Sequence, residues 1–504
     1  MPTSPINSQS SKPIKRFVRA LALPMLAIAS GCAPNPAERF PDIQRSIAER
    51  LGGRVVWDRG GAVGEAVRSE VAALLAQPLT AEAAVQVALL NNNALQATFE
   101  DLGVAQADLV QAGLLRNPDL GGFLRFPNGP PNGTNWNIGV DFWPMDAFLV
   151  PVRKKLAGAA LDVAEQRVTG LVLRLAADTR AAYYAIQAEQ QVLEARRSLV
   201  DLAQIASDFS LRQYKVGNID DLKLTEEQAS FQQASIALFQ VESAHHVARE
   251  RLRRLIGLSN SPSAWSTTPE APPPLAGEPA EEELVQIALA SRSDVSAGAK
   301  DVQRLEYALT LTRQWWLQSI RVGVETERGS GGGYQTGPHG AFEIPIFDQR
   351  QAEVARQEAL IRQARRRLTD SEGQAREEVR TALYRMRTAG RIDEYYSTQV
   401  VPLRKRTTGM MEKRYQGMLL GVFDLLTAKS EEVNAVSAAA RARQDYWTAR
   451  SDLELALGGR VPPSGHIASR PTTNPAPGEA PRSPATRPVQ TMPDMPGMSK
   501  PGAK

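Results

Sequence analysis

The sequence repeats itself with an offset of 200 residues, and this duplication limits the possible folds more than any other feature. Residues Val85–Leu89 read VQVAL, and residues Val285–Leu289 read VQIAL. Further matches at or next to this offset join Arg180 with Arg380, Ala182 with Ala382, Tyr184 with Tyr384, Val200 with Val400, and Tyr214 with Tyr415. The sequence therefore predicts two copies of one unit, each with the order helix, two short strands, very long helix, turn, helix.

Each copy contains one helical segment that is far longer than the helices of ordinary globular proteins. It covers about 67 residues, or about 100 Å at 1.5 Å per residue. Apolar residues such as Val168, Val172 and Leu175 follow a four-three spacing, which predicts that helices pack against each other as in a coiled coil. Pro402 is expected to interrupt the second long helix. The expected helices run over 79–115, 148–214 and 222–258 in copy one, and over 281–316, 348–415 and 423–457 in copy two.

The segments between the first and second helix of each copy alternate between apolar and polar residues. Residues 135–142 read NWNIGVDF and residues 319–327 read SIRVGVETE. Phe342, Ile344 and Ile346 continue the alternation after residues 337–340, and glycine-rich loops cover 128–133 and 329–333. Alternation with charges on one face predicts the wall of a membrane β-barrel, with lipid outside and water inside. A half-buried sheet in a soluble protein is the alternative.

The N-terminus resembles a bacterial lipoprotein signal. Four basic residues precede an apolar run that is too short to span a bilayer, and the run ends in Ala29-Ser30-Gly31-Cys32. The resemblance implies cleavage before Cys32 and acylation of this residue, which is the only cysteine of the chain. Ala33 follows it, and in the sorting rule of such lipoproteins this favours the outer membrane. An ordinary secretory signal with an incidental cysteine is the alternative.

Charge and composition argue against nucleic-acid binding and against catalysis. The net charge of +4 comes from the four basic residues of the signal, so 55 basic and 55 acidic residues remain after it. His245 and His246 are adjacent on an expected helix and point about 100° apart, which suits chelation poorly. The glycine run 329–333 lacks the Gly-Lys-Ser/Thr of a phosphate loop. We therefore expect no enzyme and no bound cofactor.

The last 44 residues contain eleven prolines and little apolar content, which predicts a disordered tail. Met492, Met495 and Met498 follow one another at three-residue spacing within it, and thioethers are ligands that suit Cu(I). A low-complexity tail with incidental methionines is the alternative reading. The expected division is a signal at 1–31, an anchored segment at 32–78, the first repeat at 79–258, a proline-rich linker at 259–280, the second repeat at 281–459 and the tail at 460–504.

Four motifs in the expected order resemble the TolC family of outer-membrane efflux channels, over residues 79–459. They are Leu79-Thr80 with Glu82-Ala83-Ala84, QAGLLRNP at 111–118, IPIFD at 344–348, and Tyr415 followed by Asp424-Leu425-Leu426. The resemblance implies a mainly α fold with long antiparallel helices in an α-helical barrel, and four strands per protomer in a trimeric, twelve-stranded membrane barrel.

The same resemblance implies a function, partners and a gate. The chain is expected to be a homotrimeric exit duct for compounds or metal ions, held in the outer membrane and docked to a periplasmic adaptor and an inner-membrane pump. Asp424 corresponds by its place after Tyr415 to the family's constricting aspartate, and Asp220 and Asp221 lie at the other turn. Helix capping by these three carboxylates is the alternative. The alternative functions are a periplasmic adaptor or scaffold lipoprotein, which carries a single hairpin, and a periplasmic hydrolase.

Overall fold

The computed structural model describes residues 37–126, 128–130, 133–259, 264–275, 277 and 280–461. The chain divides into two units, residues 1–464 and 465–504, and the described residues all belong to the first. This unit is mainly helical with one small sheet, as the sequence predicts. Its helices are α2 (Phe40–Leu51), α3 (Gly61–Leu75), α4 (Ala81–Asn91), α5 (Asn93–Ala112), α6 (Asp146–Lys215), α7 (Asp221–Leu255), α8 (Glu281–Ser291), α9 (Ser293–Arg313), α10 (Gln351–Tyr395), α11 (Val401–Gln416) and α12 (Val422–Leu457).

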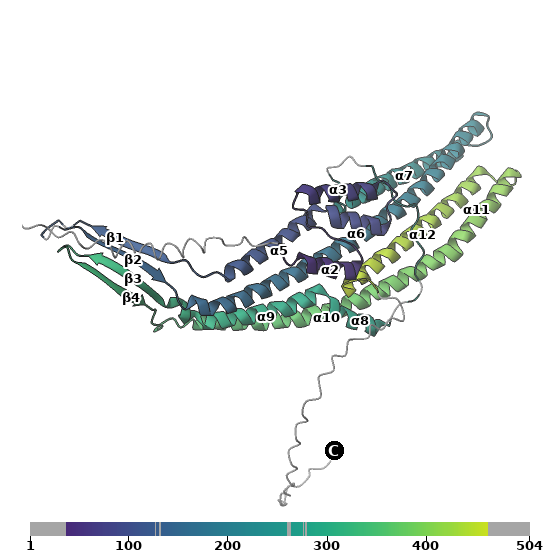
Figure 1. The fold of residues 1–504 in the computed structure, drawn as a ribbon. Coiled ribbons are helices and arrows are strands. Elements are labelled where there is room, and N and C mark those ends of the chain that lie inside the picture. The colour runs from purple at the N-terminus through teal and green to yellow at the C-terminus, as the bar shows by residue number, and fades with distance from the viewer. Residues whose placement is uncertain are drawn as a thin grey trace, which may run out of the picture. The chain divides into compact units, whose positions relative to one another are not determined.

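The long helices lie side by side in one layer. Helix α6 packs against α7 on one side and α12 on the other, and α12 packs against α10 and α11. Figure 1 shows the resulting order α7, α6, α12, α11 across the half of the layer that ends in the turns. Toward the strands, α5 and α9 flank α6, and α10 follows α9. Two helical hairpins, α6–α7 and α11–α12, therefore end in turns on the same side of the unit.

The first helix of each copy is broken, whereas the sequence predicts one continuous helix over 79–115 and over 281–316. The break falls at Asn92 between α4 and α5, and at Arg292, exactly one repeat further on, between α8 and α9. The side chain of Asn92 accepts the backbone N–H of Leu95 at 3.0 Å and donates to the carbonyl of Leu255 at 2.8 Å. A polar side chain that caps a new helix competes with helix continuation, which explains the interruption.

At each break, the chain packs against the C-terminal end of the last helix of the same copy, α7 in copy one and α12 in copy two. Gly257 and Gly458 follow α7 and α12 with φ of 74° and 73°, a conformation that favours glycine. A Cβ atom on Gly257 would lie 2.0 Å from the carbonyl oxygen of Asn91, and one on Gly458 would lie 2.9 Å from that of Ser291. The two repeats thus have the same backbone-to-backbone contact at the break, and in both repeats the contact depends on glycine, because a Cβ atom would not fit.

The prediction that the second long helix is interrupted near Pro402 is confirmed. Residues Tyr396–Val400 form a π-helical turn between α10 and α11, and Pro402 lies in the first turn of α11. Proline has no backbone N–H to donate, so it is tolerated in a first turn. A π turn holds one more residue than an α turn. The corresponding helix of copy one, α6, has no such turn and runs unbroken for 70 residues.

The main core lies around the middle of the long helices. There α4, α8 and residues 264–275 cover α6, α10 and α12. The hydroxyl of Tyr183 donates to the carbonyl of Leu79 at 2.9 Å and lies 2.6 Å from the hydroxyl of Thr268. The indole of Trp447 donates to the carbonyl of Pro272 at 2.8 Å. The segment expected as a linker is therefore held against the helices by buried hydrogen bonds in its described part.

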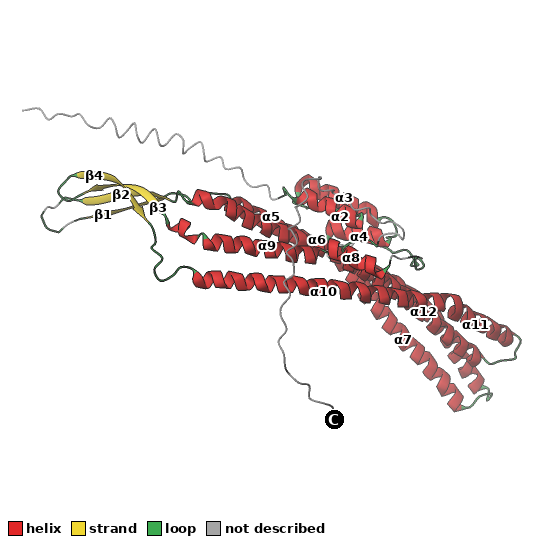
Figure 2. Ribbon diagram, turned by 90° about the horizontal axis from the view of Figure 1, so that it is seen from below, coloured by secondary structure: helices red, strands yellow, loops and turns green. Residues whose placement is uncertain are grey.

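Four antiparallel strands form one sheet in the order β1 (Asp119–Arg125), β2 (Asn135–Phe142), β3 (Arg321–Arg328) and β4 (Tyr334–Ala341). The sheet lies beyond the ends of α5, α9 and α10 (Figure 2). Strands β2 and β3, which come from different repeats, pair in its centre with Val140 opposite Val324. The two copies are therefore joined in the sheet as well as in the helical layer.

The fourth strand lies earlier in the chain than the sequence predicts. Phe342, Ile344 and Ile346 were expected to form it, but they lie beyond β4 and are exposed. The tight turn at residues 329–333 sets the register, since it places Tyr334 directly opposite Arg328. Pro338 then falls inside the strand, where it is tolerated because β4 is an edge strand.

Candidate functional site: the sheet and the hairpin turns

The two faces of the sheet differ sharply in chemistry, because side chains alternate along each strand and directly paired residues share a face. One face carries the apolar residues and is exposed to the surroundings, with Leu120 at 76% and Val324 at 53% exposure. It consists of Leu120, Leu124, Trp136, Ile138, Val140, Phe142, Val322, Val324 and Tyr334, with Thr326, Thr336 and Pro338 among them. Arg328 is the charged exception on this face, and its guanidinium lies 5.6 Å from the centroid of the Tyr334 ring. An exposed apolar face of this extent marks a surface that another apolar medium or protein covers.

The opposite face carries charged and amide groups that bind one another. The side chain of Asn137 donates to the carboxylate of Glu325 at 3.0 Å, across β2 and β3. The Nε2 atom of His339 lies 2.7 Å from an oxygen of Asp141, and the Arg321 guanidinium lies 3.7 Å from the same carboxylate. Phe123 is the apolar exception on this face, and the Arg125 guanidinium covers its ring. The sheet thus separates a polar side from an apolar side.

A buried ion pair fixes the junction between the sheet and the long helices. Asp146, the first residue of α6, is 3% exposed. Its carboxylate accepts the backbone N–H of Arg116 at 3.2 Å and the guanidinium of Arg153 at 3.0 Å. The Arg116 guanidinium in turn lies 4.8 Å from the centroid of the Trp143 ring. The direction in which the chain leaves β2 is therefore held by charge-assisted bonds.

The two hairpin turns have the same length and the same backbone geometry. Helices α6 and α11 end at Lys215 and Gln416, and α7 and α12 begin at Asp221 and Val422, so every position is offset by 201 residues. Gly217 has a φ of 76°, and its counterpart Met418 has a φ of 58°. The left-handed conformation costs a non-glycine residue about 1 kcal/mol or more, so Met418 is strained where Gly217 is not.

The three carboxylates predicted at the turns are exposed, and those of Asp220 and Asp424 cap helices. Asp220 precedes α7 and accepts the backbone N–H of Lys223 at 2.9 Å. Asp424 lies three residues after Gly421 and accepts its backbone N–H at 3.2 Å. These two bonds are the two halves of a capping box, one half in each repeat. Asp221 is the first residue of α7 and is exposed.

The common offset shows which residues correspond. Asp220 is matched by Gly421, and Asp424 is matched by Lys223, so the repeats do not place equivalent carboxylates at their turns. Lys223 Nζ lies 4.2 Å from the centroid of the Phe423 ring and therefore joins the two turns directly. It also contacts Glu226 at 3.1 Å and the buried Glu227 at 3.2 Å. Partial burial lowers the pKa of Lys223, but the bonds to both glutamates outweigh this effect and raise it.

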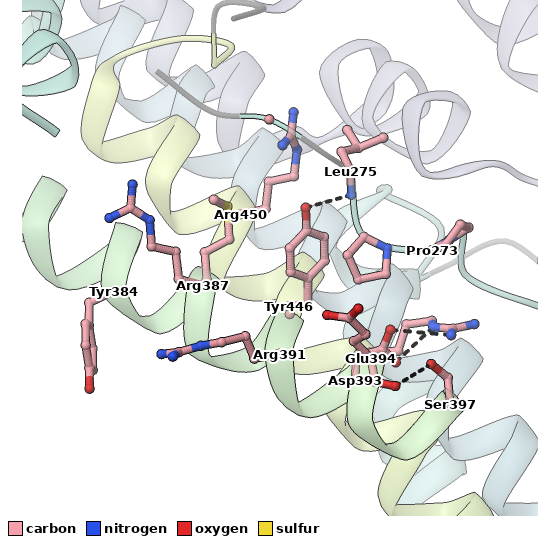
Figure 3. A pocket seen from close by; sticks show the side chains of 15 residues that line it. Pro273, Leu275, Tyr384, Arg387, Arg391, Asp393, Glu394, Ser397, Tyr446 and Arg450 are labelled. Atoms are coloured by element: carbon pink, nitrogen blue, oxygen red, sulfur yellow. Dashed lines mark hydrogen bonds and ion pairs between the residues drawn. The ribbon is translucent and has the colours of Figure 1, made fainter. Parts of the chain in front are cut away.

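A cavity of about 870 Å³, which the sequence does not predict, lies between α10, α12 and the residues Pro273, Pro274, Leu275 and Gly277. Asp393 is 1% exposed on its wall and accepts the Arg443 guanidinium at 3.1 and 3.4 Å. The backbone N–H of Leu275 donates to the hydroxyl of Tyr446 at 2.9 Å. In Figure 3 the side chains of Arg387 and Arg391 extend away from Leu275. No spacing in the sequence predicts this cavity, because it needs three segments that are far apart along the chain.

Two of the predicted sites lie outside the described residues: Cys32, and the methionines Met492, Met495 and Met498. Within the described part of the chain, no three histidine, cysteine or acidic side chains are placed to hold a metal ion together. None of the described helices combines the length and apolar character needed to cross a membrane.

The architecture is a two-faced sheet continued by a layer of very long helical hairpins. Residues 284–459 match the family model described as outer membrane efflux protein. The chain therefore carries an outer membrane efflux protein domain and has the fold of the TolC-family outer-membrane channels.

Solved structures of this fold cover most of the chain. A membrane protein from Pseudomonas aeruginosa is 17% identical, with a TM-score of 0.62 over 77% of this chain and 93% of its own. The Campylobacter jejuni CmeC outer membrane channel is 16% identical, with a TM-score of 0.61 over 77% and 87%. CusC is 15% identical, with a TM-score of 0.58 over 78% and 92%. No curated protein sequence matches the chain.

Proposed function

We propose that the protein is the outer-membrane duct of a tripartite efflux system, through which compounds or metal ions delivered by an inner-membrane pump and a periplasmic adaptor leave the cell. The observation that supports this most is the sheet, which has one exposed apolar face and one polar face. The long hairpins reach away from the sheet by a distance suited to crossing the periplasm, since 70 residues of α6 span about 105 Å.

The number of copies follows from the number of strands. In lipid, an open sheet edge leaves backbone groups unpaired at several kcal/mol each, so four strands cannot stand alone. Two copies supply about eight strands, and side chains fill the interior of so small a barrel. Three copies supply about twelve strands, which leaves room for water. We therefore propose a homotrimer whose apolar sheet faces point to lipid and whose polar faces line the passage.

The anchor belongs to the same proposal. Acyl chains on Cys32 would hold the N-terminus in the inner leaflet of the outer membrane, because each buried methylene contributes about 0.8 kcal/mol. The barrel is the main attachment and the lipid is an addition to it. The protein would accordingly be an outer-membrane lipoprotein that extends into the periplasm.

The closed end of the duct is proposed to lie at the hairpin turns. Threefold symmetry turns Asp424 into a ring of three carboxylates, and such rings select cations in other pores. Asp220 and Asp221 would add further rings nearby. The cap bond from Gly421 N–H uses one carboxylate oxygen of Asp424 and leaves the other for ions. Three lysines at Lys223 would lie in the same zone and reduce the negative potential there.

Planar-bilayer recordings test the duct and its gate. The purified protein is expected to form discrete, cation-selective channels that divalent cations block. Asp424→Asn is expected to weaken the block and the selectivity, and Asp220→Asn to do so less, because Asp424, by its place after Tyr415, corresponds to the family's constricting aspartate and Asp220 does not. Absence of any conductance from well-folded protein contradicts the duct. Channels of Asp424→Asn with unchanged block contradict the gate alone.

A further inference from the structure

A second cavity, of about 710 Å³, lies between α6, α10 and α12 on one face of the helical layer. The other face is the one that α4, α8 and residues 264–275 cover. The indole of Trp447 reaches Pro272 on that covered face, whereas Asp452, rotated from it by about 140° along α12, lines the cavity. The covering elements would block the bore of a tube if they pointed inward. In the proposed duct, the cavity therefore opens into the passage.

Arg196 and Arg441 form an arginine pair at the end of this cavity that lies nearer the hairpin turns. Arg196 lies 19 residues before the end of α6, and Arg441 lies 19 residues after the start of α12, so both are about 29 Å above the turns. The side chain of Arg196 donates to the amide oxygen of Asn434 at 2.9 Å, across α6 and α12. Burial lowers the pKa of Arg196, and the nearby charge of Arg441 lowers it further. Two cations are therefore held close together in a half-buried position.

The arginine pair lacks the ion pairs that neighbouring arginines form. Arg197, the next residue on α6, contacts Glu242 at 3.5 Å, and Arg443 on α12 contacts Asp393 at 3.1 Å. Neither member of the arginine pair forms an ion pair with a residue in the described part of the chain. Asp445, one turn further along α12, interacts with the pair electrostatically, and burial raises the pKa of its carboxylate. The pair retains an excess of positive charge, which a bound anion would neutralise.

The rest of the cavity is apolar in its middle and balanced in charge at its far end. Ala389 and Ile392 of α10 line the middle, and Ile392 is 45% exposed. The hydroxyl of Thr388 is buried on the same wall and has no hydrogen-bond partner among the described residues. Arg385 and Asp452 interact electrostatically at the far end, about 45 Å above the turns. A ligand that fits this cavity has one anionic group and an apolar body.

We propose that the cavity binds aromatic organic anions, such as sulfonates and carboxylates, with the anionic group between Arg196 and Arg441 and the ring against Ile392. The inference rests on the proposed duct and names a class of compounds that its passage holds. A volume of about 710 Å³ lies within the range of about 300–1,000 Å³ that suits drug-sized ligands. Helices α6, α10 and α12 belong to one chain, so each copy of the proposed homotrimer carries a complete site.

The carboxylates at the turns do not cancel the attraction of this site for anions. They lie about 29 Å away along the helices, whereas physiological salt screens exposed charges over about 8 Å. An aromatic anion inside the open tunnel is therefore attracted to the arginine pair, although the turns repel it at their own level.

Binding of 2-naphthalenesulfonate to the full chain in lipid nanodiscs tests the site. Isothermal titration calorimetry measures the affinity and the number of bound ligands, with empty nanodiscs as the blank. Methanesulfonate carries the anionic group without the ring, and 2-naphthol carries the ring without the charge. We expect one 2-naphthalenesulfonate per chain, and we expect each of the other two compounds to bind more weakly by about tenfold or more.

Substitutions of the arginine pair test its role. Arg196→Gln and Arg441→Gln are each expected to weaken binding by about tenfold, because a charge-assisted hydrogen bond to the anion is lost. Arg197→Gln is the matched control, since this arginine contacts Glu242 on α7 instead, and it is expected to leave binding unchanged. Asp445→Asn is expected to strengthen binding by about threefold, because it removes a negative charge from the cavity, and a folding defect cannot produce this gain.

Conductance of the same samples in planar bilayers separates the site from the duct. Channels that conduct but bind no 2-naphthalenesulfonate overturn the site and leave the duct intact. The site is also overturned if Arg197→Gln weakens binding as much as Arg196→Gln does, or if 2-naphthol binds as tightly as the anion. Protein that binds the anion as expected but forms no channels supports the site and contradicts the duct.

Discussion

Lys223 and Phe423 join the turns of the two repeats, with Lys223 Nζ 4.2 Å from the centroid of the aromatic ring. The contact is a cation–π interaction at an exposed site, worth about 0.5–1 kcal/mol. Phe423→Leu is expected to shift the balance between closed and open turns by about two- to fivefold, since a factor of ten corresponds to 1.4 kcal/mol. The frequency of spontaneous openings in planar bilayers measures this shift.

Leu222 offers the control, because it occupies the position of Phe423 in the other repeat and is exposed. Leu222→Val is expected to leave the opening frequency unchanged. Equal effects of both substitutions would show that the ring does not hold the turns together.

Arg180 and Arg380 are repeat partners whose surroundings differ. The Arg180 guanidinium is 7% exposed and contacts Glu82 at 3.1 Å and the largely buried Glu454 at 3.0 Å. Burial raises the pKa of Glu454. Arg180→Met leaves this carboxylate buried without its main partner, so we expect a loss of about 3–5 kcal/mol in the free energy of unfolding.

Arg380 contacts Glu281 and Glu282 but is 51% exposed. Arg380→Met is therefore expected to cost less than about 1 kcal/mol. Chemical denaturation in detergent compares the two variants. A loss from Arg380→Met as large as that from Arg180→Met would contradict burial as the cause.

The π turn makes a prediction about chain length. Deleting Thr398 is expected to convert residues 396–400 into regular α-helix and to keep the rest of α10 and α11 in register, because the turn holds one extra residue. The cost is expected to stay within about 1 kcal/mol. Deleting Glu377, in a regular part of α10, instead turns Val379 or Leu383 out of the core. Yield of folded trimer in the outer membrane measures both, and equal loss would argue against the π turn as an insertion.

The lipid anchor is tested by mass spectrometry of the mature N-terminus. We expect an acylated Cys32 with no residues before it. With a replaced signal, Cys32→Ser is expected to insert in lower yield and still to form channels, because the sheet provides the main attachment. An unmodified Cys32, or cleavage at another bond, would refute the anchor.

The sequence predicts the order of the helices and strands well, because that order follows from the spacing of apolar residues along the chain. Three predictions rest on local patterns, and the structure confirms them: the long helices from the four-three spacing of apolar residues, the strands β2 and β3 from alternation, and the interruption at Pro402. The fourth strand was misplaced because a glycine-rich turn, rather than the alternation of Phe342 and Ile344, sets its register.

The turns show a different limit of sequence reasoning. Seven residues separate Tyr214 from Asp221 and nine separate Tyr415 from Asp424, so the turns look unequal in the sequence, but Asp221 and Asp424 are not equivalent residues. The equal geometry becomes visible only through backbone conformation, in which Met418 takes the place of Gly217. Methionine is rare in the left-handed region, so nothing in the sequence predicts this conformation at Met418.

Native mass spectrometry of the detergent-extracted protein shows whether copies of this chain close a membrane pore. Its four strands per chain predict three copies and about twelve strands, since a closed wall with an aqueous interior needs more than about eight. We expect a trimer that resists mild detergent and dissociates to monomers on heating. A stable monomer or dimer under the conditions that preserve conductance would contradict it.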